Sequence, residues 1–92
     1  MDKDIKDFVE SYLQLDKGFQ EEIRERIELI NATLSALIVY NNNSYSTQRQ
    51  KDVLLSSYRK NIKRIETLTR VEYPNICNGD LDEYIKDFLN NK

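Results

Sequence analysis

The sequence predicts an all-α protein, an antiparallel helical bundle of two long central helices with a short helix at each end. Three observations support this. The 92 residues include only two glycines and one proline, the residues that most disfavour a helix interior. Apolar residues recur every three or four positions in four segments. A polar Asn- and Ser-rich segment separates the two longest of them, and the length fits a single domain over residues 1–92.

The first half of the chain predicts a short helix followed by a long one. We expect helices over residues 3–15 and 18–40, with Asp16 as the cap between them. Within residues 32–40, apolar side chains occupy more than one face of the second helix, which indicates a central position in the bundle or an oligomer interface. The apolar stripes are Ile5, Phe8, Val9, Tyr12 and Leu13 in the first helix and Phe19, Ile23, Ile27, Ile30, Leu34, Leu37 and Ile38 in the second.

The third helix is expected over residues 48–71. Asn and Ser side chains compete for backbone hydrogen bonds, so residues 41–47 are expected to form a loop, with Ser46 or Thr47 capping the helix that follows. Tyr58 lies on the apolar stripe of this helix and is expected in the core. Pro74 ends the helix, because the residue before a proline is disfavoured in helical conformation.

The fourth helix is expected over residues 81–90. Asn78-Gly79 predicts a turn before it, and Asp80 and Glu83 have the spacing of a capping box. Short connections favour antiparallel neighbours, so we expect the four helices to close as an up-and-down bundle.

Composition excludes several classes of function. No segment approaches the ~20 apolar residues of a membrane span, and the first residues lack the apolar core of a signal peptide, so a cytoplasmic location is expected. The chain has one cysteine and no histidine, which removes most metal sites and nucleophile–base pairs. We therefore expect no metal, no cofactor and no enzymatic activity. Cys77 is expected to be a half-buried structural thiol, and capping or solvated roles are expected for Asp80, Asp82, Glu83 and Asp87.

Charge is unevenly distributed along the chain. Residues 47–72 contain seven basic and three acidic residues, although the whole chain has a net charge of −2. One interpretation is a contact with nucleic acid or an acidic protein through Arg59, Lys60, Lys63 and Arg64. The other is that these cations pair across the bundle with Glu21, Glu22, Glu25 and Glu28. The isoelectric point near 5.1 favours the second interpretation, since dedicated DNA-binding domains are usually basic.

The end of the hairpin at the polar loop is the predicted partner-binding site. Tyrosine is enriched in interfaces because it combines a large rigid contact area with a hydroxyl group. Three tyrosines lie in or near this loop, of which Tyr58 belongs to the predicted core. The predicted partner-binding residues are Tyr40, Asn42, Tyr45 and Arg49.

Two resemblances bear on function. Residues 7–30, DFVESYLQLDKGFQEEIRERIELI, resemble the helix-rich tail that follows the DNA-reading domain in many phage repressors, where a Leu-Asp turn joins two amphipathic helices. The overall layout is similar to the small four-helix immunity proteins that protect lactic-acid bacteria from their own bacteriocins. That second resemblance implies an alternative function as a bacteriocin immunity protein.

Elimination leaves a protein that acts through its surface. The leading hypothesis is a non-enzymatic protein-interaction module, a small regulator or inhibitor encoded by a phage or mobile element that binds a host or cognate protein. A composition rich in Asn, Ile, Lys and Tyr indicates an AT-rich genome, which fits such an origin. A homodimer would add burial that a chain of this size lacks as a monomer. The alternative hypothesis is a nucleic-acid-associated transcriptional regulator that uses the basic helix over residues 48–71.

Overall fold

The computed structural model describes residues 2–43, 45 and 47–91, and these residues form four α-helices and no strand. The helices are α1 (Lys3–Gln14), α2 (Lys17–Asn41), α3 (Gln48–Thr69) and α4 (Asn78–Asn90). The predicted all-α fold, with two long helices between two short ones, is confirmed. None of the helices in the described ranges is long and apolar enough to cross a membrane.

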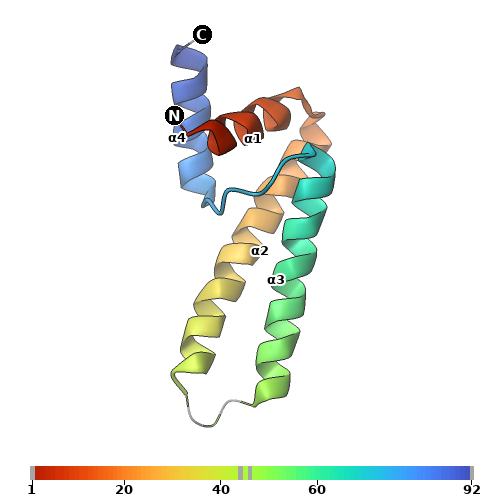
Figure 1. Ribbon diagram of the computed structural model, residues 1–92, viewed down its shortest axis with the longest axis vertical. Helices are drawn as coiled ribbons and strands as arrows, with labels where there is room; N and C mark the ends of the chain where they lie inside the picture. Colours follow the sequence, from red (N-terminus) through yellow and green to blue (C-terminus); the bar gives the residue numbers. More distant parts are fainter. Residues whose placement is uncertain (1, 44, 46, 92) are drawn as a thin grey trace.

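The four helices do not form an up-and-down bundle along their full length. In Figure 1, α2 and α3 run side by side as a long hairpin, while α1 and α4 gather at the end away from the hairpin loop. The molecule is therefore elongated, with extents of 51 × 21 × 19 Å. The reason is length, because twelve or thirteen residues at 1.5 Å each span only ~20 Å and cannot cover the longer helices.

The hydrophobic core lies where α1 and α4 meet the hairpin. Phe8 of α1 is fully buried, and its ring meets the ring of Tyr73 edge to face, with centroids 5.9 Å apart. The Tyr73 hydroxyl donates to the Ile76 carbonyl oxygen at 2.7 Å, which fixes the segment between α3 and α4. Burial raises the pKa of Tyr73 to about 12. The other buried hydrophobic residues of the core are Val9, Tyr12, Ile23, Ile27, Ile30, Ile65, Ile76 and Leu81.

The remainder of the hairpin, residues 34–57, we call the arm. None of the arm residues that the structure describes is buried. Ile38, Val39 and Val53 expose 63%, 64% and 63% of their surface. The apolar second half of α2 therefore does not occupy the centre of a bundle, which was one of the two expectations from the sequence. Tyr58, predicted as core, is partly buried against the core from the boundary of the arm.

The ends of α3 match the prediction at one end only. Thr47 caps the start of α3, as one of the two predicted candidates, in a reciprocal box with Gln50; Ser46, the other candidate, lies outside the described residues. Helix α3 ends at Thr69, two residues before the predicted end. Arg70 adopts a left-handed conformation with φ of 61°, and its N–H donates to the Glu66 carbonyl oxygen.

The start of α4 differs from the prediction. The helix begins at Asn78, so Asn78-Gly79 belongs to its first turn and is not a separate turn. The capping box is formed by Cys77 and Asp80, whose carboxylate accepts from the Cys77 N–H at 3.1 Å, and not by Asp80 and Glu83. Because Cys77 stands at an exposed helix end, its thiol is exposed, and the expectation of a half-buried thiol is wrong.

Candidate protein-binding surface

Tyr40 and Arg49, two of the four predicted partner-binding residues, lie together at the tip of the arm. Both line a shallow hollow of about 310 Å³ between the end of α2 and the start of α3. Val53 and Leu54 are its apolar residues, and Thr47 and Gln50 complete its lining. The hollow combines an aromatic ring, an arginine and aliphatic side chains, the residue types that anchor protein–protein contacts.

Asn42 and Tyr45 lie on the loop at the same end of the hairpin. Tyr45 is 92% exposed, and its backbone N–H donates to the Asn43 side-chain oxygen at 2.9 Å. Asn42 is the C-cap of α2, and its N–H donates to the Ile38 carbonyl oxygen at 3.2 Å. The structure thus brings all four predicted residues to one end of the molecule, although only two of them share the hollow. We call Tyr40, Asn42, Tyr45 and Arg49 the tip surface.

Local hydrogen bonds hold the α3 side of the tip in place. Thr47 Oγ1 accepts from the Gln50 N–H at 3.2 Å, and Gln50 Oε1 accepts from the Thr47 N–H at 3.0 Å. This capping box satisfies backbone donors that a helix start leaves without partners. The first turn of α3, which carries Arg49, is therefore fixed before any partner binds.

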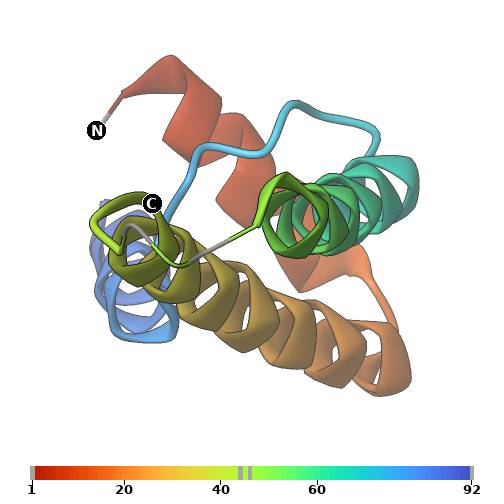
Figure 2. The same ribbon diagram turned by 90° about the horizontal axis from the view of Figure 1, so that it is seen from below.

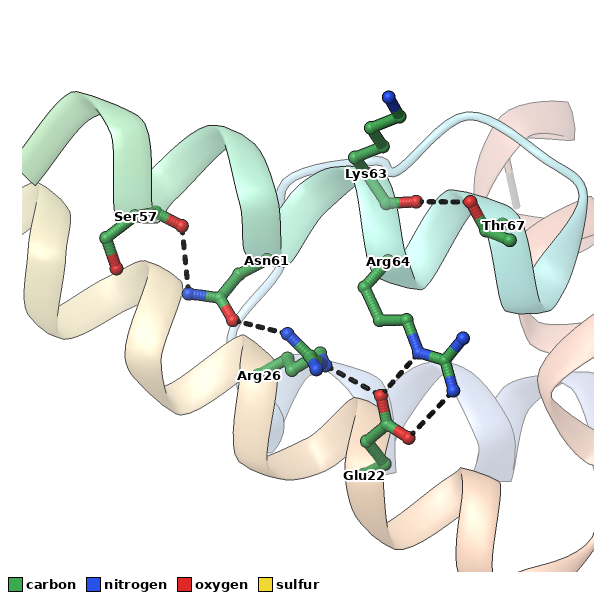
Figure 3. Close-up of polar contacts among 7 residues, drawn as sticks. All are labelled: Glu22, Arg26, Ser57, Asn61, Lys63, Arg64 and Thr67. Carbon is green, nitrogen blue, oxygen red and sulfur yellow. Dashed lines mark hydrogen bonds and ion pairs between the residues drawn. The ribbon is translucent and has the colours of Figure 1, made fainter.

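Three of the four predicted basic residues lie on the exposed side of α3. Among the described residues, Arg59, Lys60 and Lys63 form no ion pair, and they line a second shallow hollow with Asp52, Leu55 and Ser56. In Figure 3 the Lys63 side chain extends away from α2. These cations are therefore free to meet an acidic group from outside the chain.

Arg64 is engaged within the chain. Its guanidinium donates from Nε to Glu22 at 2.8 Å, and Arg26 donates to the same carboxylate at 2.7 Å (Figure 3). The hydrogen bonds from Arg64, followed by those from Arg26, lower the pKa of Glu22 to about 2. Glu22 therefore carries its charge at neutral pH, and pairing across the hairpin, one of the two interpretations from the sequence, holds for Arg64 and Glu22.

A buried asparagine in the hairpin was not identified from the sequence. Asn61 is 7% exposed; its side-chain oxygen accepts from Arg26 at 2.9 Å and its nitrogen donates to the Ser57 carbonyl oxygen at 3.0 Å (Figure 3). Its position in the sequence could have indicated that it is buried, because Asn61 lies four residues before the fully buried Ile65 on the same face of α3. A buried amide with both groups bonded stabilises one register of the two helices.

A second polar cluster joins the terminal helices to α2. Arg24 donates to the Tyr12 hydroxyl at 2.8 Å and to Asp82 at 2.7 Å, and its guanidinium lies over the Tyr12 ring, 5.6 Å from the centroid. The Asn78 amide donates to the Arg24 carbonyl oxygen at 3.0 Å. Asp82 thus forms an ion pair, and Asp80 caps the start of α4. No group of three potential metal-ligating side chains occurs within the part of the chain that the structure describes.

No known protein family, curated protein or solved structure matches the chain. The surface of the molecule is therefore the basis for any functional assignment.

Proposed function

We propose that this protein is a non-enzymatic interaction module that binds a host or cognate protein through the tip surface of its arm. In its most concrete form it is a cytoplasmic regulator or inhibitor encoded by a phage or mobile element, and it works as a homodimer. The observation that carries this proposal is the hollow that Tyr40 and Arg49 line beside the 92%-exposed Tyr45.

The placement of the tip supports this role. The core lies at the opposite end of the hairpin, so substitutions of the exposed tip residues leave the buried core intact. A tyrosine and an arginine beside aliphatic groups offer a partner both apolar area and directed hydrogen bonds. Binding sites of this kind usually depend on a few such anchors, with the surrounding contacts excluding water.

The test is affinity capture of the tagged protein from a bacterial lysate, read by mass spectrometry. Wild type should retain one dominant protein, and Tyr45→Ala combined with Arg49→Ala should reduce its recovery at least about tenfold, since hot-spot truncations cost ~2 kcal/mol or more. The matched control is Phe19→Ala combined with Arg70→Ala, which removes an aromatic ring and an arginine from exposed positions outside the arm. Equal recovery with the tip and control variants would contradict the proposal.

One observation favours a second candidate, a nucleic-acid-associated regulator that uses α3. Arg59, Lys60 and Lys63 extend from one side of α3 without an internal ion pair among the described residues. Three such cations on one helix match the electrostatic footprint of phosphate binding. In the same capture experiment, nuclease treatment of the lysate distinguishes the two candidates, because material held through nucleic acid is lost.

A further inference from the structure

The second half of α2 is uncharged and carries apolar side chains on more than one face. Residues 29–43 contain no charged side chain. In contrast, the two turns before Leu29, from Glu22 to Glu28, carry five glutamates and arginines, and Glu21 precedes them. Leu34 and Leu37 lie on the side that meets α3, yet Leu29 and Val39 are 53% and 64% exposed. A helix with apolar residues on more than one face normally packs against more than one neighbour. In this chain α3 covers one side of it only, as Figure 2 shows along the hairpin axis.

Apolar residues on the side of α2 that faces away from α3 follow a heptad pattern, in which Leu29, Ala32 and Val39 are exposed and Ala36 is half-buried. Leu29, Ala32, Ala36 and Val39 are spaced by three, four and three residues, the spacing of a coiled-coil seam. We call these four residues the outer seam. At 3.6 residues per turn they point away from the inner seam that meets the core and α3, which consists of Ile23, Ile27, Ile30, Leu34 and Leu37.

We propose that the outer seam is a dimer interface, and that α2 of a second copy packs against it in the antiparallel direction. The order large, small, small, large is the same from either end of the seam. An antiparallel copy therefore places Leu29 opposite Val39 of the second copy and Ala32 opposite its Ala36. The two central alanine layers let the backbones approach closely, and the larger residues close the ends of the contact.

The self-complementary order of the outer seam favours a second copy as the occupant, and the neighbouring charges do not oppose it. Glu25 and Glu28 continue the stripe toward the start of α2. In the register that pairs Leu29 with Val39, they lie opposite the uncharged Asn43 and Tyr40 of the second copy. No charge is buried and no like charges meet in this arrangement.

The geometry leaves the rest of the molecule unobstructed. Arg24 and Asn31, through which α2 contacts Asp82 of α4 and the Ile76 carbonyl oxygen, lie on a different side of α2 from the outer seam. The two arms would overlap along ~15 Å of α2, with the two α3 helices on the outside. Four residues from each copy make a small contact, and small interfaces are typically weak and transient, so we expect a dissociation constant of roughly 10–100 μM.

The dimer rests on the proposed role of the arm as a docking element, but its contact is centred on the outer seam and does not include Tyr45 or Arg49. Analytical ultracentrifugation over a concentration series measures it. Wild type should dimerise, and Val39→Glu should weaken dimerisation at least about tenfold by placing two charges in the contact. The matched control is Ile38→Glu, since Ile38 is equally exposed on α2 but lies off the outer seam. It should leave the dissociation constant within about threefold of wild type.

Both substitutions put a good helix former at an exposed position, and circular dichroism verifies that both variants are folded. A wild-type chain that is monomeric at every concentration would overturn the dimer, as would equal weakening by the two variants. If the dimer is overturned, capture of the same protein by the Val39→Glu variant would still support the proposed function of the tip surface. Loss of capture by the tip variants, with dimerisation unchanged, separates the two sites.

Disulfide trapping tests the direction of the pairing. In a Cys77→Ser background, a mixture of the Ala32→Cys and Ala36→Cys variants should form cross-linked heterodimers under mild oxidation, because residues 32 and 36 face each other in the antiparallel register. Each variant alone should cross-link far less. Efficient cross-linking of each variant with itself would contradict the antiparallel register, since that result requires parallel helices.

Discussion

Replacing Phe8 by alanine should lower the free energy of unfolding by about 3–5 kcal/mol, the usual cost of removing a buried aromatic ring. Phe8 is fully buried and meets Tyr73 edge to face, so its loss removes the contact that joins α1 to the segment before α4. A domain of this size is stable by only ~5–10 kcal/mol, so a large fraction of the variant should be unfolded near physiological temperature.

Phe19→Ala is the matched control for Phe8, because it removes the same ring from a site that is 40% exposed. Its cost should be below about 1.5 kcal/mol, since much of the ring already contacts water. Urea denaturation followed by circular dichroism compares the two variants. Similar midpoints would show that α1 is not part of the cooperative core.

Ile27→Ala should destabilise the protein by about 2–5 kcal/mol, whereas Ile38→Ala should cost less than ~1 kcal/mol. The two residues lie on one face of α2, eleven positions apart, so they share helical context and side-chain chemistry. They differ in burial, because Ile27 is fully buried while Ile38 is 63% exposed.

The comparison of Ile27 with Ile38 uses the same denaturation experiment at a concentration low enough for the chain to be monomeric. The comparison tests whether tight packing along α2 stops at the point where α1 and α4 no longer cover it. Equal losses from the two substitutions would mean that the arm is packed as tightly as the rest, and would contradict the division of the molecule into a core and an exposed arm.

Helical periodicity predicted which segments form helices, but some boundaries depend on interactions between distant residues. Thr47 was predictable as a cap because its hydroxyl acts within its own turn. The start of α4 was not, because the Asn78 side chain donates to the carbonyl oxygen of Arg24 in α2. Arg70 ends α3 in a left-handed conformation that is normally taken by glycine, so the sequence contained no marker for it.

The candidate site was predictable to the extent that it follows from connectivity. Tyr40 and Arg49 flank one loop between antiparallel helices, so they must lie close together. Exposure was harder to predict, because Leu34 and Ile38 continue the stripe of Ile27, and a periodic pattern does not show which part of a stripe another helix covers. The short lengths of α1 and α4 were the available indication that the end of the hairpin would be left uncovered.

The central claim is that the core carries the stability of the fold and leaves the arm exposed for binding. Hydrogen exchange measured by mass spectrometry tests it most directly, using the Val39→Glu variant as a monomer and wild type at concentrations where it dimerises. In the monomer, amides of α2 beyond Leu34 should exchange at least about a hundredfold faster than those around Ile23 and Ile27, since locally packed regions open least. In wild type, rising concentration should slow exchange in the arm and leave the core unchanged. Arm amides as protected as core amides in the monomer would contradict the claim.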